Sequence, residues 1–217
     1  KGENMAMPSV FDAPVINAAV FHQSTIKLGT HFGLIAGIRL DYEHNRLDYN
    51  SNTTLQYDFA IQKPRPITLT NQETSSSLVG KIQHNYFKCL PKLALRYNVN
   101  PNYSFFASSA RGMRSGGYNI QMISDLLRAD IINRMRNPSA ELPNVDQAIT
   151  YKPETSWNAE LGGHLSPVAG LDITFACYYI RTSNQQIAKF APSGLGRMMA
   201  NAGISRSLGS ECQIRYN

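Results

Sequence analysis

The sequence lacks any apolar run long enough to cross a membrane as a helix. Its longest apolar runs are only a few residues, whereas a spanning helix needs about 20 apolar residues. This excludes a helical membrane protein. A membrane-spanning β-strand needs only about 9–11 tilted residues with one apolar face. A mean hydropathy of −0.29 is therefore compatible with the wall of a β-barrel.

Cysteine is scarce, because the 217 residues contain only Cys89, Cys177 and Cys212. The three are far apart, odd in number and without CxxC spacing, so they predict neither a disulfide framework nor a zinc site. Each falls on the apolar phase of a segment of alternating polarity. We therefore expect all three to act as small hydrophobic side chains.

Motifs for catalysis and metal binding are also missing. The five histidines show no HExxH or comparable spacing, and the sequence has no GxSxG elbow and no phosphate-binding loop. We therefore expect no enzyme activity, no metal site and no cofactor. The formal charge is +6, but lysine and arginine are scattered rather than clustered, so we expect no nucleic-acid partner.

Both ends of the sequence resemble cut points in a longer chain. The first nine residues show no apolar signal core with a small-residue cleavage site. Residues 215–217 fall within an alternating segment that has no closing turn. We expect the chain to be part of a larger protein.

What the sequence does contain is a regular spacing of turns. Tight turns are predicted at residues 28–31, 98–102 and 166–170, about every 70 residues, and long polar segments at 50–77, 115–152 and 186–202 separate them. A sheet with short connections at one end and long connections at the other is typical of an outer-membrane β-barrel.

Between the turns, polarity alternates with a period of two, as in β-strands. Residues 154–165 are the clearest case: the phase of Trp157 and Leu161 is apolar, and the phase of Glu154 and Glu160 is polar. Residues 32–43, 89–99, 171–179 and 204–216 alternate similarly, and 15–27 and 103–114 less clearly. We count about seven strands, each long enough to cross a bilayer. Aromatic residues near strand ends would form interface girdles, namely Tyr42, Tyr97, Tyr103 and Tyr179.

A soluble antiparallel sandwich would show the same alternation, with its apolar face in a core. Two features favour the barrel. Strands of about ten residues exceed the roughly 5–6 residues usual in globular sheets, and the long connections are uncommon in compact domains. We predict an all-β antiparallel meander that is a fragment of a large transmembrane β-barrel. The sandwich, as a binding module of an exported protein, is the alternative.

The amino-acid sequences of several predicted strands also resemble motifs of a known family. ARGMRSGGYN at 110–119 resembles the "rGyrsGGfN" segment of TonB-dependent outer-membrane receptors, and YKPETSWNAELG at 151–162 resembles their "kPE…nyElG" strand. LPKLALRY at 90–97, LIAGIRLDY at 34–42, and NAG followed by ISRSLGSE at 201–211 are similar to further elements of that family. Ser210 stands where the family has an apolar residue. The matches follow family order from about residue 18 to residue 215.

The resemblance implies a barrel of about 22 strands with an N-terminal plug in its lumen, so this chain would carry about a third of the wall. It has no TonB box, no plug sequence and no terminal aromatic strand end. We therefore expect residues 1–217 to be a partial barrel domain of a receptor in the outer membrane of a Gram-negative-type envelope. The implied partners are outer-membrane lipid and lipopolysaccharide, TonB through the missing N-terminal region, and a ferric-siderophore-like ligand. A haem, vitamin or saccharide ligand stays open.

Four residues stand where a strand would rise into an external loop, namely Arg111, Arg114, Tyr118 and Asn119. They are the candidate ligand-binding residues, because charge-assisted hydrogen bonds from such groups would hold an anionic ferric chelate. The alternative is that the arginines bind lipopolysaccharide phosphate or nearby carboxylates and the tyrosine anchors the interface. Glu154 and Glu160, on the lumen phase, are expected to pair with charges of the wall or the plug.

A short helix is predicted at residues 122–136, inside the longest polar segment. Ile123, Leu127, Ile131 and Met135 recur at helical spacing. Asp125 near its start and Arg134 near its end complement the helix dipole. Such a helix would be a lid in an external loop or would simply pack on that loop.

Overall fold

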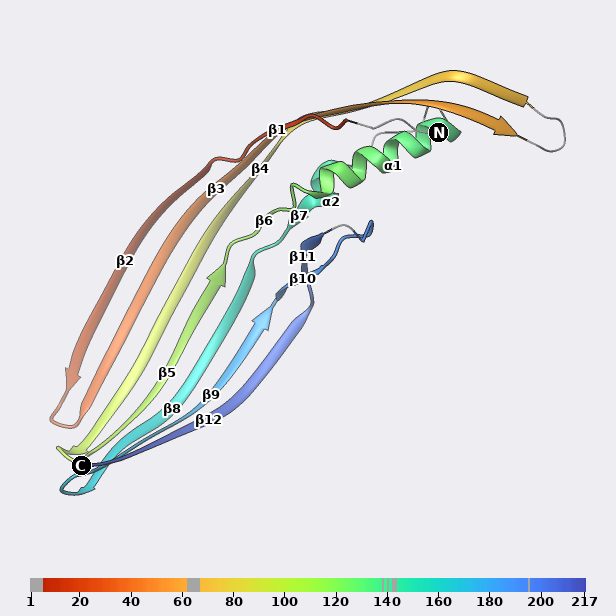
Figure 1. Ribbon diagram of the computed structural model, residues 1–217. Coiled ribbons are helices and arrows are strands. Elements are labelled where there is room, and N and C mark those ends of the chain that lie inside the picture. The colour runs from red at the N-terminus through yellow and green to blue at the C-terminus, as the bar shows by residue number, and fades with distance from the viewer. Residues whose placement is uncertain (1–5, 62–66, 138, 140, 142–143, 195) are drawn as a thin grey trace.

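The computed structural model describes residues 6–61, 67–137, 139, 141, 144–194 and 196–217. These residues form one curved antiparallel sheet with two helices at one end (Figure 1). The strands of the sheet are β1 (Ser9–Asp12), β2 (Val15–Leu28), β3 (Phe32–Ile61), β4 (Ile67–Asn100), β5 (Tyr103–Arg114), β8 (Glu154–Val168), β9 (Leu171–Ser183) and β12 (Ile204–Tyr216). Their order is β1-β3-β4-β5-β8-β9-β12, and β2 also pairs with β3. The predicted meander is confirmed.

β1 and β2 follow one edge of β3 in a single register, because Asp12 pairs with Asp48 and Val15 pairs with Asn45. Pro14 lies between them, and its carbonyl accepts a hydrogen bond from the Arg46 amide at 3.1 Å. Proline has no N–H to donate to the ladder, which explains the interruption. The two segments therefore act as one strand, and with β1 and β2 counted together the sheet has the expected seven strands.

The three predicted tight turns all lie at one end of the sheet, which we call the turn end (Figure 1). Gly29 and Gly170 adopt positive φ there, at +69° and +83°, which glycine tolerates without steric cost. The opposite end, the helical end, carries α1 (Met122–Arg136) and α2 (Val145–Ile149). The predicted helix at 122–136 is confirmed. Short connections thus gather at one end and long ones at the other.

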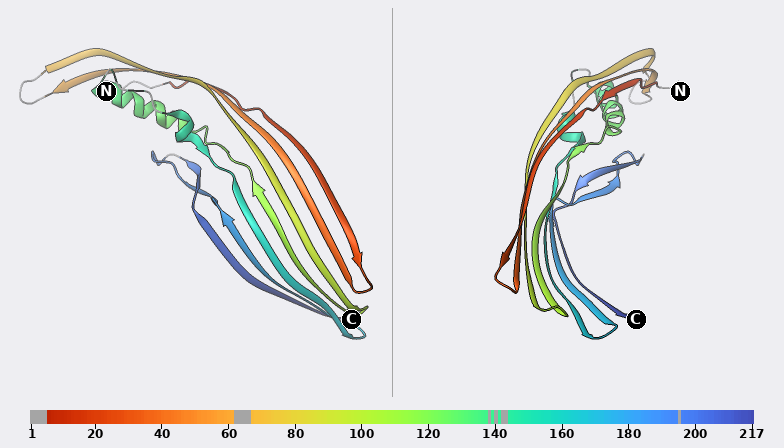
Figure 2. Two further views of the ribbon diagram at one scale, coloured as in Figure 1. Left: turned by 180° about the vertical axis from the view of Figure 1, so that it is seen from behind. Right: turned by 90° about the vertical axis from the view of Figure 1, so that its left-hand side faces the viewer.

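The helical end also contains two small antiparallel pairs. β6 (Gly117–Tyr118) pairs with β7 (Thr150–Tyr151), and β10 (Gln186–Phe190) pairs with β11 (Arg197–Asn201). The helix α1 and the β10–β11 hairpin both lie on the concave side of the sheet (Figure 2). We call this concave face inward and the opposite face outward.

The polar segment at 50–77 differs from the loop that its sequence predicts. β3 continues to Ile61 and β4 resumes at Ile67, so most of the segment is a long two-stranded arm that extends past α1 (Figure 1). Its strands remain paired, with one register shift between Tyr57 and Phe59. The expectation of an irregular connection is therefore wrong for the described part of this segment.

The registers align the outward side chains of the strands into a largely apolar band toward the turn end, interrupted on β2 by His22 and Ser24. On β3 the band runs from Phe32 to Tyr42, and on β12 from Tyr216 to Leu208; large exposed members include Phe87, Leu93, Leu95, Tyr97, Phe105, Trp157, Leu161 and Tyr179. The three cysteines are also on this phase, as expected, and are free. In the described part of the chain no second sheet covers the band. The sandwich alternative is therefore wrong.

The border of the band shows how the strands are tilted. It lies at Tyr42 on β3 but at Leu208 on β12. Following the paired residues across the five strand pairs from β12 to β3 leads from Leu208 to Ala36, which is six residues from Tyr42. The border thus falls by about six residues over about five strand steps, which corresponds to a tilt of about 40° with about 3.3 Å per residue and about 4.8 Å between strands. Transmembrane barrels have strand tilts of roughly 35–45°.

The hydrophobic core lies elsewhere, at the helical end. Leu47, Leu78 and Ile82 point inward from β3 and β4 and pack against Ile123 and Leu127 of α1. Met122, Val145, Ile149 and Ala191 complete this cluster. No helix in the described part of the chain is long and apolar enough to cross a membrane.

Candidate functional site

A buried ion pair joins β3 to β4 on the inward face, at the level where the apolar band ends. Lys88 Nζ donates to Glu43 Oε2 at 2.5 Å, and the two residues are only 8% and 6% exposed. Ser115 Oγ donates to the same carboxylate at 2.5 Å and accepts from Lys88 at 2.7 Å, while Asn45 Nδ2 donates to Glu43 Oε1 at 2.9 Å. Because Ser115 follows β5, this cluster fixes the start of the connection that carries α1.

The registers place the two candidate arginines on opposite faces. In the register of β5 and β8, Arg114 stands opposite Glu154 on the inward face, and its side chain is exposed. Arg111 pairs with Trp157 on the outward face. They are three positions apart, an odd offset, so period-two geometry forbids a shared face. The structure therefore does not bring Arg111 and Arg114 into one site.

Tyr118 lies on β6 at the helical end, half-buried against the core. Its hydroxyl donates to the Asn45 carbonyl at 3.2 Å. Burial, followed by the nearby Tyr86 and Asp146, raises the pKa of Tyr118 to about 12. The phenol therefore stays protonated at neutral pH and keeps its O–H as a donor.

Asn119 is 4% exposed and uses its side chain to join two connections. Its Nδ2 donates to the carbonyls of Ile149 at 3.2 Å and Met199 at 2.9 Å, and its Oδ1 accepts from the Met199 amide at 2.7 Å. The second pair of bonds links it to β11 as a strand partner would. Asn119 thus positions Tyr118 and the β10–β11 hairpin relative to each other.

Two further amide side chains also join connections through hydrogen bonds, and the sequence did not identify them as site residues. Asn201 accepts from the Lys152 amide at 2.7 Å and donates to the carbonyls of Lys152 and Asn184, each at 2.9 Å. Gln186 Nε2 donates to the Ser115 carbonyl at 2.7 Å. The signal was present, since Asn119, Lys152 and Asn201 belong to three of the quoted family segments. The structure shows that these segments meet at one junction.

Glu154 is on the inward phase, as expected. In the described residues its hydrogen-bond partner is a backbone amide of this junction and not a charged side chain. Its Oε2 accepts a hydrogen bond from the Gln186 amide at 2.5 Å. Glu160 is also on the inward phase, between Ser108 and Tyr178 of the neighbouring strands. Glu154 therefore helps to hold β10 against the end of β8.

A second side-chain link attaches α2 to the inward face of β4. Asp146 Oδ1 accepts from Thr150 at 2.6 Å and lies 2.9 Å from His84 Nε2. Partial burial raises the pKa of Asp146, but the hydrogen bonds from Thr150 and His84 outweigh it, so the pKa lies below its usual value. The carboxylate is thus charged at neutral pH.

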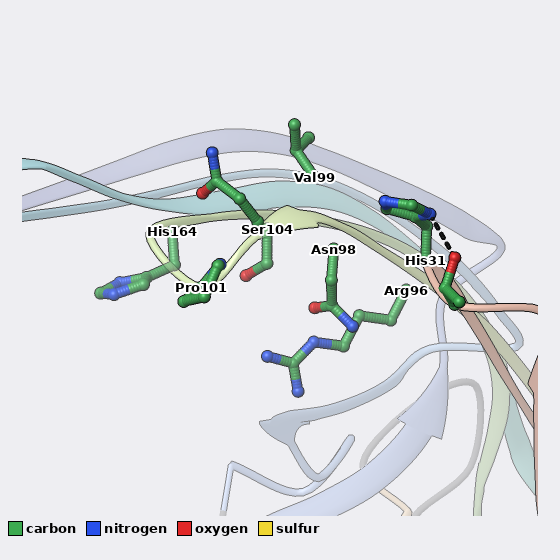
Figure 3. Close-up of a pocket in the computed structure, with 9 residues that line it drawn as sticks. His31, Arg96, Asn98, Val99, Pro101, Ser104 and His164 are labelled. Carbon is green, nitrogen blue, oxygen red and sulfur yellow. Dashed lines mark hydrogen bonds between the residues drawn. The ribbon is translucent and has the colours of Figure 1, made fainter.

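A hollow of about 440 Å³ opens at the turn end of the inward face (Figure 3). Arg96, Asn98, Ser104 and His164 line it from three adjacent strands, with His31 and Pro101 at its rim. His31 Nδ1 lies 2.7 Å from Thr30 Oγ1. The lining is polar and basic, which suits a polar protein segment or an anion. In the described residues no three His, Cys, Asp or Glu side chains gather as a metal site.

Comparison with known proteins identifies the fold. Residues 9–217 match the family model described as TonB dependent receptor-like, beta-barrel. The ferric yersiniabactin uptake receptor FyuA from Yersinia pestis is similar in structure, with a TM-score of 0.62 and 18% identity over 97% of this chain and 26% of that one. The siderophore receptor PirA from Pseudomonas aeruginosa has a TM-score of 0.44 and 15% identity over 93% of this chain and 37% of that one. A comparison with curated proteins found no match. The chain spans about a quarter of the length of FyuA.

Proposed function

Because this chain belongs to the TonB-dependent receptor-like β-barrel family, we propose that residues 1–217 form part of the wall of an outer-membrane receptor that imports a small ligand. The missing strands, the plug and the TonB-contacting region belong to the rest of that receptor. Two open edges support this proposal, because within the described residues β2 and β12 each pair on one side only. A strand edge in lipid must find a partner, since no water is present to satisfy its backbone groups.

The observation that carries the proposal is the apolar band. It lies on one face only, it is about as tall as a bilayer core, and its border indicates a tilt of about 40°. The inward face at the same height carries charged and small residues, among them Arg39, Asp41, Lys92 and Gly37. This combination suits lipid on one side and a watery or plugged lumen on the other.

We assign the helical end to the outside of the cell and the turn end to the periplasmic side. Outer-membrane barrels have short periplasmic turns and long external loops. In this orientation the basic hollow around Arg96 and His164 faces the periplasmic part of the lumen, where a plug would lie. Energy for import would reach the plug through TonB, as in the family.

The ligand we propose is a ferric siderophore. FyuA, which shares the fold, is a receptor for ferric yersiniabactin. Arg114 offers an exposed cation on the inward face. Tyr118 lies on β6 and keeps a protonated hydroxyl that donates to the Asn45 carbonyl. Asn119 takes part by holding the backbone at Tyr118. A haem, vitamin or saccharide ligand would be an outcome of the uptake test below.

The barrel proposal is tested by a spin-label scan of residues 155–161 in the full receptor, reconstituted in lipid. Oxygen accessibility should peak at Ala159 and Leu161 and be lower at Trp157, which lies at the border of the band, while accessibility to a polar nickel reagent should peak at Ser156, Asn158 and Glu160. If the apolar phase excludes both reagents, it is buried in protein and the proposal is wrong.

The ligand proposal is tested by uptake of ferric siderophores, beginning with ferric yersiniabactin, into cells that carry the receptor. Arg114→Gln should lower the apparent affinity about tenfold, because a charge-assisted hydrogen bond contributes roughly 1.5–3 kcal/mol. Arg111→Gln is the matched control, since it removes an arginine of the same strand from the opposite face. Equal losses in both variants would contradict a lumen-facing site.

A further inference from the structure

Three arginines lie on the outward face in one row of register partners across adjacent strands, although these strands are far apart in the sequence. Arg111 of β5 pairs with Trp157 of β8, Trp157 pairs with Arg181 of β9, and Arg181 pairs with Arg206 of β12. The side chains of Arg181 and Arg206 are exposed, and Trp157 is 48% exposed. The row was not visible in the sequence, because its members are not clustered there.

The pair of Arg181 and Arg206 is electrostatically unfavourable as it stands. Directly opposite residues on one face of an antiparallel pair have Cβ atoms about 4.5–5.5 Å apart, and like charges there destabilise the sheet. The outward neighbours along the strands carry no carboxylate; they are Ala159, Tyr179 and Leu208 on one side and Thr155, Ser183 and Ile204 on the other. The ion pairs of the described residues include none of the three arginines.

Two other arginines of the same sheet, Arg39 and Arg46, are paired with a carboxylate of their own strand. Arg39 Nε lies 2.8 Å from Asp41, and Arg46 is paired with Asp48. Arg46 is the closest comparison, because it also lies on the outward phase but beyond the border of the band. Arg181 and Arg206 differ from both in lying directly opposite each other with no carboxylate among their outward neighbours, so an anion that relieves their repulsion would come from outside the described chain.

The location of the row identifies the kind of anion. Tyr179 and Leu208 lie at the border of the apolar band on β9 and β12. Arg181 and Arg206 are the next outward residues toward the helical end, followed by Ser183 and Ile204. Leu208 is 82% exposed. A molecule that contacts both groups must therefore combine acyl chains with an anionic head, and a tryptophan at the same level is typical of a membrane interface.

We propose that Arg181 and Arg206, flanked by Trp157 and Arg111, bind the phosphate groups of a lipid headgroup in the outer leaflet. The proposal rests on the membrane location given above. Each guanidinium presents a planar fork of N–H donors that matches a phosphate in a bidentate manner. A phosphate between Arg181 and Arg206 also cancels their repulsion, so the bound lipid stabilises the pairing of β9 with β12.

The test measures lipid bound to the full receptor by native mass spectrometry, after incubation in detergent with bisphosphorylated lipid A or with its dephosphorylated form. The unmodified receptor should retain the phosphorylated lipid preferentially. Replacing both Arg181→Gln and Arg206→Gln should weaken that binding about tenfold or more, because two charge-assisted contacts are removed. Arg46→Gln, which removes an outward arginine that already has a carboxylate partner, should leave it unchanged.

A charge reversal separates loss of the site from loss of the fold. Arg206→Glu should abolish preference for the phosphorylated lipid and yet raise the urea midpoint of the receptor in lipid without phosphate, since it turns a repulsive cross-strand pair into an attractive one. Unchanged lipid preference in this variant and in the double variant would overturn the proposal.

Two further outcomes are informative. If inorganic phosphate displaces the phosphorylated lipid at equal molar concentration, the row is a general anion site and the lipid assignment is wrong. The spin-label pattern at 155–161 is independent of these results. A correct pattern with no lipid preference would reject this inference alone, whereas a pattern without oxygen accessibility would reject the barrel itself.

Discussion

The two ends of β3 show opposite arrangements of apolar and polar side chains. Toward the turn end its outward residues are apolar from Phe32 to Tyr42. Beyond Tyr42 the outward residues are His44, Arg46, Asp48 and Asn50, and the apolar side chains appear on the inward face, where Leu47 is fully buried under α1. The strand keeps its period of two throughout, but the apolar phase changes sides.

This difference shows what determines the phase of a strand. In lipid the outward face must be apolar, and the lumen tolerates charge. Outside the membrane, water meets the outward face, so apolar side chains are stable only where another element covers them. The helices α1 and α2 and the residue Ala191 provide that cover. In the described residues the hydrophobic core therefore lies beyond the apolar band, where helices cover the sheet.

The change of phase coincides with the buried pair of Glu43 and Lys88, and breaking that pair should have the largest effect. Lys88→Ala leaves the Glu43 carboxylate buried without its cation, which costs about 3–5 kcal/mol. Hydrogen exchange of α1 in the full receptor should show this loss, whereas Lys92→Ala, on the same face of β4 but exposed, should change little. Equal effects would mean that the pair does not anchor the helical end.

The second largest effect is expected in the core of the helical end. Leu127 is fully buried against the inward face. Leu127→Ala should destabilise the packing of α1 by about 2–5 kcal/mol, through lost burial and the cavity left behind. Hydrogen exchange of α1 measures this. Ile132→Ala is the control, because Ile132 is an exposed residue of the same helix; comparable losses would contradict the packing described.

A matched pair of arginine substitutions tests the two outward surfaces directly. Leu161 lies within the apolar band, and Val79 lies on the outward phase of β4 beyond it; both are exposed to a similar degree. Leu161→Arg should cost about 2–4 kcal/mol in lipid, as at the midplane of other barrels, and Val79→Arg about 0.5 kcal/mol or less. Urea midpoints in phospholipid vesicles measure both. If the two variants agree, the band does not meet lipid.

Much of this arrangement could be predicted from the sequence. The spacing of turns and the alternation of polar and apolar residues located the strands, because one face of each predicted strand is apolar over most of its length. Helical spacing of Ile123, Leu127 and Ile131 located α1. Each of these signals is local and depends only on period.

The rest depends on contacts between distant segments. The arm of β3 and β4 was missed because Ser51, Thr53 and Ser76 are polar and yet buried on its inward face, so no apolar phase marks the strands. Ser76 instead donates to Asp130 of α1 at 2.6 Å. The opposite faces of Arg111 and Arg114 were already implied by their offset of three along one strand. The role of Asn119, in contrast, follows from a strand 80 residues away. Registers of this kind cannot be read from composition.

The smallest effect concerns acid, and it should separate the two ends of the sheet. The pKa of Asp146 lies below the 3.8 of an unperturbed aspartate, so its contribution to folding is complete above pH 3.8 and is lost as the pH falls through the lower folded-state value. Hydrogen exchange of α2 amides should accelerate in that acid window. The effect is modest, because the side chain is half exposed and solvent screens the pair.

Asp146→Asn is the control for this experiment, because it removes the titrating group while keeping a hydrogen-bond acceptor. In that variant the extra acid dependence of α2 should disappear. The amides of β8 around Leu161 should show no such dependence in either form, because lipid contact and strand pairing stabilise them and Asp146 is far from them in the fold. Acid loosening of both ends together would mean that the helical end and the apolar band form one cooperative unit, contrary to their separate sources of stability.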